Sequence, residues 1–151
     1  MSFEVRAASK ADAQALLELE LDARDALAHA RGGPQLLAES PAVGDWAALL
    51  GGGDRVVLVS TIDDLVLGYL VLALPAPGTA STGIVEQVYV APGARELGFG
   101  DWMIEQAIDA VRVAGGDAIE SFALPGDRDT KNLFERAGIT ARKIVVHKRL
   151  G

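Results

Sequence analysis

The stretch VYVAPGARELGFGDWM, residues 88–103, determines how this chain is organised around its centre. Apolar and aromatic residues stop at Pro92, Arg95 follows, and Gly98 and Gly100 come at the start of an apolar-periodic run. This order predicts a strand, then a glycine turn, then a helix whose entrance carries little side chain.

Such an entrance can bind an anion through the backbone alone. A helix N-terminus leaves N–H groups without intrahelical partners, and the helix dipole adds partial positive charge there. Gly98 and Gly100 keep Cβ atoms away from these N–H groups, and Arg95 adds a charged, forked donor at the mouth. A tight turn that binds nothing explains the two glycines equally well, because short glycine patterns match easily.

Two well-known phosphate loops do not fit this stretch. A dinucleotide-binding turn needs a third glycine after Gly100, and the sequence has none at that spacing. A Walker loop needs lysine and then serine or threonine after its last glycine, whereas Asp101 follows Gly100 here.

Working outward from the turn, periodicity predicts a mixed α/β chain. Ser9 and Asp12 form a near capping box at the start of an alanine- and leucine-rich helix. The expected elements are a strand at 3–8, a helix at 10–30, a helical stretch ended by glycines 51–53, a hairpin of 55–61 and 65–74, a loop with Pro75, Pro77 and Gly78, a strand at 83–90, a helix from 98, a strand at 118–125, a helix at 129–138 and a closing strand at 139–150. Without repeats or long linkers, residues 1–151 are expected to form one domain.

Composition excludes several classes of function. The 151 residues include no cysteine and two histidines, so disulfides and thiolate catalysis are excluded and a metal site is not expected. The formal net charge of −7 argues against a nucleic-acid partner. It suits a cationic acceptor such as an amine, although many cytoplasmic proteins are simply acidic. We also expect no membrane partner and a cytoplasmic location, because neither a membrane span nor a secretion signal is recognisable.

The segment Arg95-Glu96-Leu97-Gly98-Phe99-Gly100 resembles the acetyl-coenzyme A motif of the GNAT acyltransferases. The preceding VYVAP is similar to that family's strand ending in valine and proline, and LFERAG is similar to its segment before the last strands. The order of elements is similar along essentially the whole chain. The resemblance implies an α/β (α+β) GNAT-like fold, with a central mixed, mostly antiparallel sheet flanked by helices.

The resemblance also implies which residues bind the cofactor. The backbone of the turn would bind the pyrophosphate of acetyl-coenzyme A, and the edge of the preceding strand would pair with the two amides of pantetheine. Carried over to this sequence, these residues are Arg95, Leu97, Gly98, Phe99, Gly100 and Asp101 for the pyrophosphate, and Val88 and Val90 for pantetheine.

For catalysis, the resemblance implies direct attack of an amine on the acetyl carbonyl, with a base to accept the amine proton. Glu86 is the candidate base, and a period of two places it on the same strand face as Val88 and Val90. An exposed strand carboxylate in a salt bridge is the equally weighted alternative.

Two departures from the family pattern bear on this reading. Phe134 stands where many members carry a tyrosine that protonates the leaving thiolate, and we expect Phe134 to be a core aromatic. Either the thiolate leaves unassisted, another group such as Ser121 or Tyr89 serves instead, or catalysis is weak. Glu96 and Leu97 stand where a glycine and a second basic residue are common, which weakens phosphate binding by about 1 kcal/mol.

We therefore expect an N-acetyltransferase that uses acetyl-coenzyme A and acts on a primary amine of a small molecule, peptide or protein. The alternative is a GNAT-like module that binds an acyl-coenzyme A or regulates without turnover. A homodimer is compatible with either.

Overall fold

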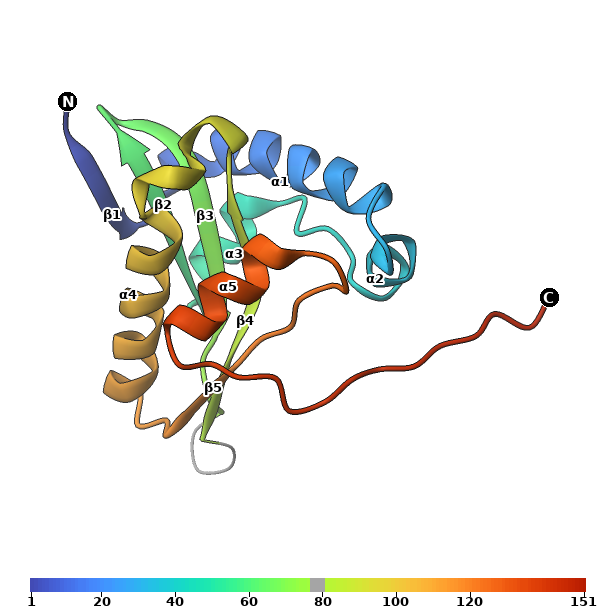
Figure 1. Ribbon diagram of the computed structural model, residues 1–151. Helices are drawn as coiled ribbons and strands as arrows, with labels where there is room; N and C mark the ends of the chain where they lie inside the picture. Colours follow the sequence, from blue (N-terminus) through green and yellow to red (C-terminus); the bar gives the residue numbers. More distant parts are fainter. Residues whose placement is uncertain (77–80) are drawn as a thin grey trace.

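The computed structural model describes residues 1–76 and 81–151, so Pro77 and Gly78 of the expected loop lie outside the described residues. Its centre is a five-stranded sheet in the order β1-β2-β3-β4-β5 (Figure 1). The first three pairings are antiparallel, and β4 pairs with β5 in parallel. The strands are β1 (Phe3–Ala7), β2 (Arg55–Ile62), β3 (Leu65–Ala73), β4 (Thr82–Val90) and β5 (Ala118–Glu120).

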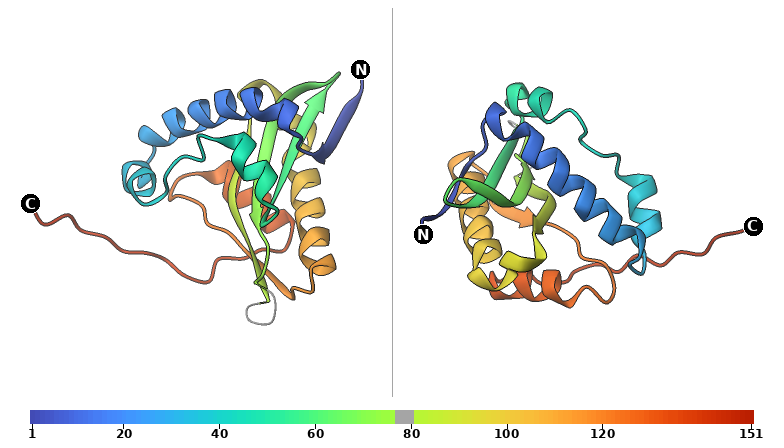
Figure 2. Two further views of the ribbon diagram at one scale, coloured as in Figure 1. Left: turned by 180° about the vertical axis from the view of Figure 1, so that it is seen from behind. Right: turned by 90° about the horizontal axis from the view of Figure 1, so that it is seen from above.

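Helices cover both faces of this sheet (Figure 2). They are α1 (Ala13–Ala28), α2 (Gly33–Glu39), α3 (Trp46–Gly52), α4 (Phe99–Val113) and α5 (Arg128–Arg136), with 3-10 turns η1 (Lys10–Asp12) and η2 (Pro92–Leu97). The mixed, mostly antiparallel sheet flanked by helices confirms the fold expected from the sequence. None of the helices in the described part of the chain is long and apolar enough to cross a bilayer.

Two apolar cores lie on opposite faces of the sheet because side chains alternate along each strand. On one face, Leu70 and Leu72 of β3 pack with Met103 and Ile104 of α4. On the other face, the alternate residues of β2 and β3 pack against α1 and α3. This second core contains Leu16, Leu19, Trp46, Val57, Val59, Tyr69 and Val71. Packing on the two faces of β3 therefore places α4 on one side of the sheet and α1 on the other, and β4 lies beside β3 between them.

The start of α1 is fixed by the buried carboxylate of Asp12. It accepts hydrogen bonds from Nη1 and Nη2 of Arg6 at 2.8 and 3.0 Å, and from the backbone N–H of Ser9 at 2.8 Å. The last bond is one half of the expected capping box. The hydrogen bonds and charge of Arg6 hold the pKa of Asp12 below its ordinary value, although burial opposes this.

Asp12→Asn is expected to lower the free energy of unfolding at neutral pH by about 1–3 kcal/mol. Because folding lowers the pKa of Asp12, the contribution of its ionised form is complete above the unfolded-state pKa of about 3.9 and is lost as the pH falls through the lower folded-state value. Urea unfolding at pH 7 and at about pH 3 checks this expectation. A difference between parent and variant that stays constant with pH would contradict it.

The end of the chain differs from the expectation. Residues 139–151 form no strand, so the predicted closing strand is wrong for this structure, and β5 covers only three of the residues expected at 118–125. Gly138, with φ of +79°, ends α5, and the N–H of Ile139 returns to the carbonyl of Phe134 at 2.9 Å. The chain then leaves the body without a neighbouring strand to pair with, which a β-strand requires.

Candidate functional site

The sheet splits between β4 and β5. The two strands pair only at Thr82–Ala118, Gly83–Ile119 and Ile84–Glu120, although β4 continues to Val90. Where the pairing ends, the Ser121 hydroxyl donates a hydrogen bond to the carbonyl of Val85 at 2.8 Å. The last part of β4 therefore keeps its pairing with β3, while no strand in the described part of the chain pairs with its other edge.

A β-bulge at Glu86 accompanies the split. In the pairing of β3 with β4, Leu72 lies opposite Val85 and Val71 lies opposite Gln87, so Glu86 has no partner across the ladder. The bulge reverses the alternation of side chains, as an extra residue in one strand must. The sequence could not show this reversal, because it depends on how β4 pairs with β3.

The expected shared face of Glu86, Val88 and Val90 is therefore wrong. Val88 and Val90 pack in the core under α4. Glu86 instead meets Arg55, which lies on the same face of β2 as Val57 and Val59, the residues that face α1. Its side chain thus lies on the α1 face of the sheet.

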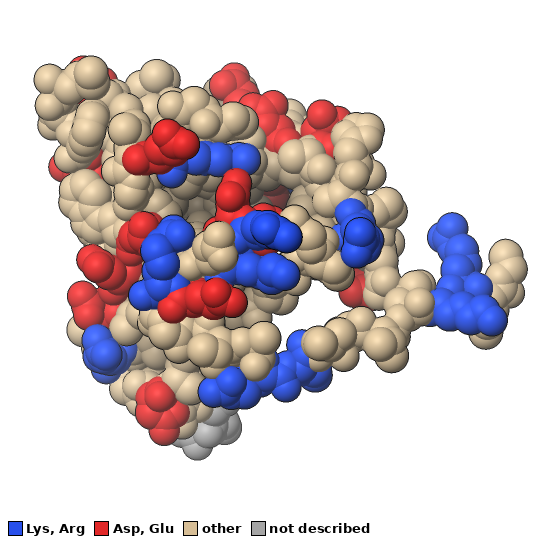
Figure 3. Space-filling model, in the orientation of Figure 1, with Lys and Arg blue, Asp and Glu red and all other residues tan. Residues whose placement is uncertain are grey.

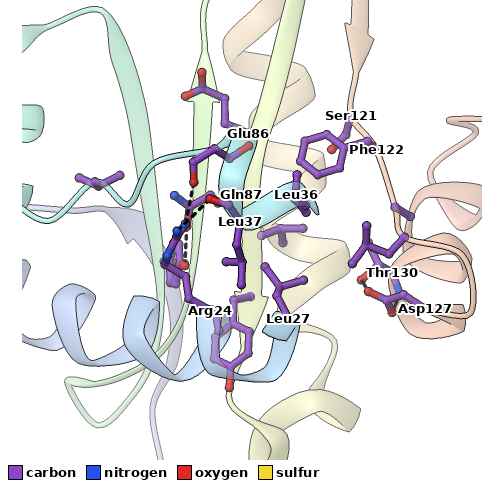
Figure 4. A pocket seen from close by; sticks show the side chains of 18 of the residues that line it. Arg24, Leu27, Leu36, Leu37, Glu86, Gln87, Ser121, Phe122, Asp127 and Thr130 are labelled. Carbon is purple, nitrogen blue, oxygen red and sulfur yellow. Dashed lines mark hydrogen bonds between the residues drawn. The ribbon is translucent and has the colours of Figure 1, made fainter. Parts of the chain in front are cut away.

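A cavity of about 490 Å³ occupies the split. Figure 4 shows two sets of side chains that face each other across it. One set comes from α1 and β4 and includes Arg24, Glu86 and Gln87; the other follows β5 and includes Ser121 and Phe122. Further lining residues are Leu27, Leu36 and Leu37 from α1 and α2, and Asp127 and Thr130 at the start of α5. The cavity is thus mostly apolar, with carboxylates at opposite sides.

Glu86 lines this cavity while it is held by Arg55. Its oxygens accept hydrogen bonds from Nε and Nη2 of Arg55 at 2.7 and 3.2 Å. These bonds and the charge of Glu86 raise the pKa of Arg55 above its ordinary value. Because 38% of the Glu86 side chain remains exposed, the carboxylate is both oriented and accessible. The salt bridge that was weighed against catalysis is present, and it leaves room for a second partner.

Gln87 is a lining residue that sequence reasoning missed. Its amide nitrogen donates to the buried carboxylate of Glu20 at 3.0 Å, and its oxygen accepts from the Tyr69 hydroxyl at 2.6 Å. Glu20 also accepts from the N–H groups of Val43 and Gly44. Burial, and then the charge of Glu20, raise the pKa of Tyr69 well above its ordinary value, so Tyr69 stays a donor. A glutamate within the apolar stripe of α1 was the available sequence signal for this network.

The turn after β4 has the geometry expected of an anion site. Gly98 has φ of +82°, where L residues are rare, and α4 begins directly after it without a side chain that caps its N–H groups. An added Cβ at Gly98 would meet open space. The first N–H groups of α4, from Phe99, Gly100 and Asp101, make no hydrogen bond to the described residues and are available to a ligand.

Arg95 supports this turn from the side of β4. Its Nε donates to the carbonyl of Val90 at 2.9 Å, and its guanidinium lies 5.5 Å from the ring centroid of Tyr89. Both contacts hold η2 against the end of β4. The remaining guanidinium nitrogens make no hydrogen bond to the described residues. Arg95 thus stabilises the turn through Nε, and its other guanidinium nitrogens are available to donate to a ligand.

The other residues of the turn have distinct environments. A Cβ at Gly100 would lie 3.2 Å from Leu133, so this glycine allows α5 to approach α4 closely, which is a different reason from the one expected. Phe99 is buried in the core, whereas Leu97 is exposed. The Asp101 carboxylate accepts from Nε of Arg136 at 2.9 Å, which ties α4 to α5 beside the turn.

Basic side chains gather on the face of the molecule that carries α5, although the net charge of the chain is negative. Figure 3 shows Lys and Arg side chains around a hollow on the face that carries α5. That helix contributes Arg128, Lys131 and Arg136, and its first turn lines the cavity. A polyanionic ligand at the turn would lie in a locally favourable field.

Phe134 lies in the core under α4 and is not among the residues that line the cavity. Its interpretation as a core aromatic is therefore supported. Ser121 and Tyr89, the two other candidate proton donors, both line the cavity. The Ser121 hydroxyl already donates to Val85, whereas the Tyr89 hydroxyl makes no hydrogen bond to the described residues.

These features define an α/β protein with a cavity at a split in its sheet and, beside the cavity, a helix start whose N–H groups no side chain of the described residues caps. The sequence model of the acetyltransferase (GNAT) family matches residues 15–139, which is most of the chain. The chain belongs to this family. No sequence among the curated proteins matches it.

Solved structures share the fold along nearly the whole chain. A tetramutant of the BH1408 protein from Bacillus halodurans superposes with a TM-score of 0.77 at 18% identity, covering 97% of this chain and 99% of that one. Ribosomal-protein-alanine N-acetyltransferase from Brucella melitensis biovar Abortus 2308 gives 0.72 at 18% identity, covering 99% and 100%. Aminoglycoside 6'-N-acetyltransferase AAC(6')-Ih from Acinetobacter baumannii gives 0.67 at 16% identity, also covering 99% and 100%.

Proposed function

We propose that this protein transfers an acetyl group from acetyl-coenzyme A to a primary amine. The observation that carries the proposal is the uncapped start of α4 directly beside a β4 edge that has separated from β5 over a cavity. A backbone anion site and an open strand edge then lie next to each other, as a ligand with a pyrophosphate and two amides requires.

The residues present fit this cofactor. The N–H groups of Gly98, Phe99, Gly100 and Asp101 bind the pyrophosphate, together with the backbone at Arg95 and Leu97. Open space at Gly98 leaves room for phosphate oxygens. The edge of β4 at Val88 and Val90 offers donors and acceptors to the pantetheine amides. Arg128 and Lys131 of α5 add positive charge for the phosphate group of coenzyme A that lies outside the pyrophosphate.

When bound, acetyl-coenzyme A supplies the thioester carbonyl that the amine attacks. Glu86 accepts the amine proton, directly or through a water molecule. Arg55 orients the Glu86 carboxylate toward the cavity through its two hydrogen bonds. The apolar wall from α1 and α2 contacts the body of the acceptor and excludes water.

Two observations favour the alternative, a module that binds an acyl-coenzyme A without turnover. Glu86 is engaged with Arg55, and the residue at the usual position of the acid is the buried Phe134. The two functions differ in whether a thiol is released when an amine is added. They share the same cofactor site.

Of the two remaining candidate acids, Tyr89 and Ser121, Tyr89 is better placed, because its hydroxyl donates no hydrogen bond to the described residues. Tyr89→Phe is expected to lower turnover about tenfold, at or below the lower end of general acid catalysis, because a thiolate is a good leaving group. Ser121→Ala is the matched control and is expected to change turnover less. Steady-state rates at saturating acetyl-coenzyme A check this. A larger loss for Ser121→Ala would reverse the assignment.

The experiment that tests the function is a thiol-release assay with a panel of amines. The panel contains aminoglycosides, peptides with an N-terminal alanine, and small apolar amines, since two proteins of this fold are named for the first two classes. Because the chain has no cysteine, the thiol reagent detects free coenzyme A alone. Amine-dependent release supports the transferase. Binding of acetyl-coenzyme A without release for any amine supports the module.

A further inference from the structure

One wall of the cavity carries a cation that has no role in the proposed transfer. Among the described residues that line the cavity, Arg24 of α1 is the only basic side chain, whereas Glu86 and Asp127 are carboxylates. Arg24 forms no ion pair with any residue that the structure describes. A positive charge at a mostly apolar cavity therefore has no acidic partner within the described protein.

Two hydrogen bonds hold the Arg24 guanidinium in place. Its Nη1 donates to the carbonyl of Ser40 at 2.8 Å and its Nη2 to the carbonyl of Leu37 at 3.4 Å, both at the C-terminal end of α2. These acceptors are neutral, and the other N–H groups of the side chain donate no hydrogen bond to the described residues. A guanidinium presents its donors in one plane, in the geometry that matches a carboxylate. Arg24 is thus oriented by α2 and retains donors for an anion.

Arg24 lies near the part of β4 that carries the proposed base. Burial, and then the charge of Glu20, raise the pKa of Tyr69 well above its ordinary value, and the charge of Arg24 opposes them. The Tyr69 hydroxyl that feels this charge donates to Gln87, the neighbour of Glu86 in β4. Glu20 already accepts from two backbone N–H groups and from Gln87, so its oxygens are engaged away from Arg24.

We propose that the acceptor is an amino acid with a free α-carboxylate and an apolar side chain, whose carboxylate binds Arg24 while its amine faces Glu86. The inference rests on the proposed function, because it names the acceptor of that transfer. An amino acid carries a cation and an anion on one carbon atom, and one wall of the cavity offers a carboxylate at Glu86 and a guanidinium at Arg24 (Figure 4). Complementary charges of this kind fix the orientation of a ligand as well as its identity.

The other lining residues favour an apolar side chain on this amino acid. Leu27, Leu36 and Leu37 lie on the same side of the cavity as the guanidinium, and Phe122 faces them from the other side (Figure 4). The carboxylate of Asp127, which also lines the cavity, would repel a second carboxylate on the acceptor. An acidic amino acid is therefore expected to be a poorer acceptor than leucine.

Transfer to such an acceptor balances without a further reactant. The bond between the amine nitrogen and the acetyl carbon forms, and the carbon–sulfur bond of the thioester breaks. Starting from the ammonium form, the nitrogen loses two protons; one leaves to solvent through Glu86, and the other ends on the released sulfur. The products are an N-acetyl amino acid and coenzyme A with a free thiol.

Three amines with the same isobutyl group test the carboxylate site: L-leucine, L-leucinamide and 3-methylbutylamine. The parent is expected to show a kcat/KM for L-leucine roughly 10- to 100-fold above that for L-leucinamide, as a hydrogen-bonded charged pair contributes. The amine of the amide loses its proton more readily, so a preference for L-leucine cannot come from amine basicity. A kcat/KM for either carboxylate-free amine that equals or exceeds that for L-leucine would overturn the inference.

Arg24→Gln separates carboxylate binding from support of α2. Without the guanidinium charge, the ratio of kcat/KM for L-leucine to that for L-leucinamide is expected to fall to about one. A role confined to holding α2 would instead lower both values alike and keep the parent ratio, which would contradict the inference. Arg112→Gln is the matched control, because it makes the same change at an exposed position of α4, and it is expected to keep the ratio.

Calorimetric titration of L-leucine distinguishes failure of this inference from failure of the proposed function. With coenzyme A present, the parent is expected to bind L-leucine roughly 10- to 100-fold more tightly than L-leucinamide. This preference without thiol release from acetyl-coenzyme A would contradict the transfer and support the carboxylate site. Thiol release with carboxylate-free amines, without a preference for L-leucine, would contradict the carboxylate site and support the transfer.

Discussion

Glu86→Gln is expected to lower turnover about 100- to 10,000-fold while leaving the affinity for acetyl-coenzyme A nearly unchanged. Glutamine keeps the size of the side chain and one acceptor toward Arg55, but it cannot take a proton from an amine or a water molecule. The cofactor site at the 95–101 turn is built from other residues, so binding is spared. Steady-state rates with the best amine and calorimetric titration of acetyl-coenzyme A measure the two effects separately.

The pH dependence gives this prediction a second readout. The loss caused by Glu86→Gln is expected to shrink at high pH, because more of the amine is then already neutral. Glu105→Gln is the matched control, since it makes the same change on the exposed face of α4. Identical rate–pH profiles for the parent and Glu86→Gln would remove Glu86 from the mechanism. They would favour transfer driven by proximity alone.

Gly98→Asp is expected to weaken the binding of acetyl-coenzyme A at least about tenfold. Two like unit charges about 5 Å apart repel each other by about 3 kcal/mol at an effective dielectric constant of about 20. If screening leaves about 1.4 kcal/mol of this repulsion, the affinity falls by a factor of ten. The new carboxylate would stand in the open space beside the free N–H groups, where the pyrophosphate is proposed to bind. Calorimetric titration at low ionic strength measures the effect, which added salt reduces.

Two variants separate charge from backbone strain in this experiment. Gly98→Asn has the same shape without the charge, and asparagine tolerates a left-handed backbone as aspartate does. Gly53→Asp places the same residue at φ of +78°, also facing open space, at the end of α3. Both are expected to bind acetyl-coenzyme A much more tightly than Gly98→Asp. Equal affinities for Gly98→Asp and Gly98→Asn would mean that no anion binds at this turn.

The sequence was sufficient to predict those parts of the fold that depend on local signals. The glycine turn, the apolar stripe of α4 and the antiparallel hairpin of β2 and β3 all follow from the spacing of neighbouring residues, and the structure confirms them. The role of Gly100 is different, because its reason lies in Leu133 on another helix. Contacts of this kind have no local pattern.

The site was predictable only in part for the same reason. The bulge that moves Glu86 to the face of Arg55 is a property of two paired strands, and neither strand shows it alone. The tail has the composition of a strand, but composition does not say whether the fold places another strand beside it. Gln87 and Glu20 meet from β4 and α1, so their hydrogen bond is visible only once the fold brings these elements together.

The most direct test of the central claim follows both products of the reaction in one sample. Parent protein, acetyl-coenzyme A and the best amine of the panel are incubated together; free thiol is measured with a thiol reagent and acetylated amine by mass spectrometry. We expect thiol and acetylated amine to appear in equal amounts, at a rate that falls at least about 100-fold in Glu86→Gln. Saturable binding of acetyl-coenzyme A without an acetylated amine would contradict it.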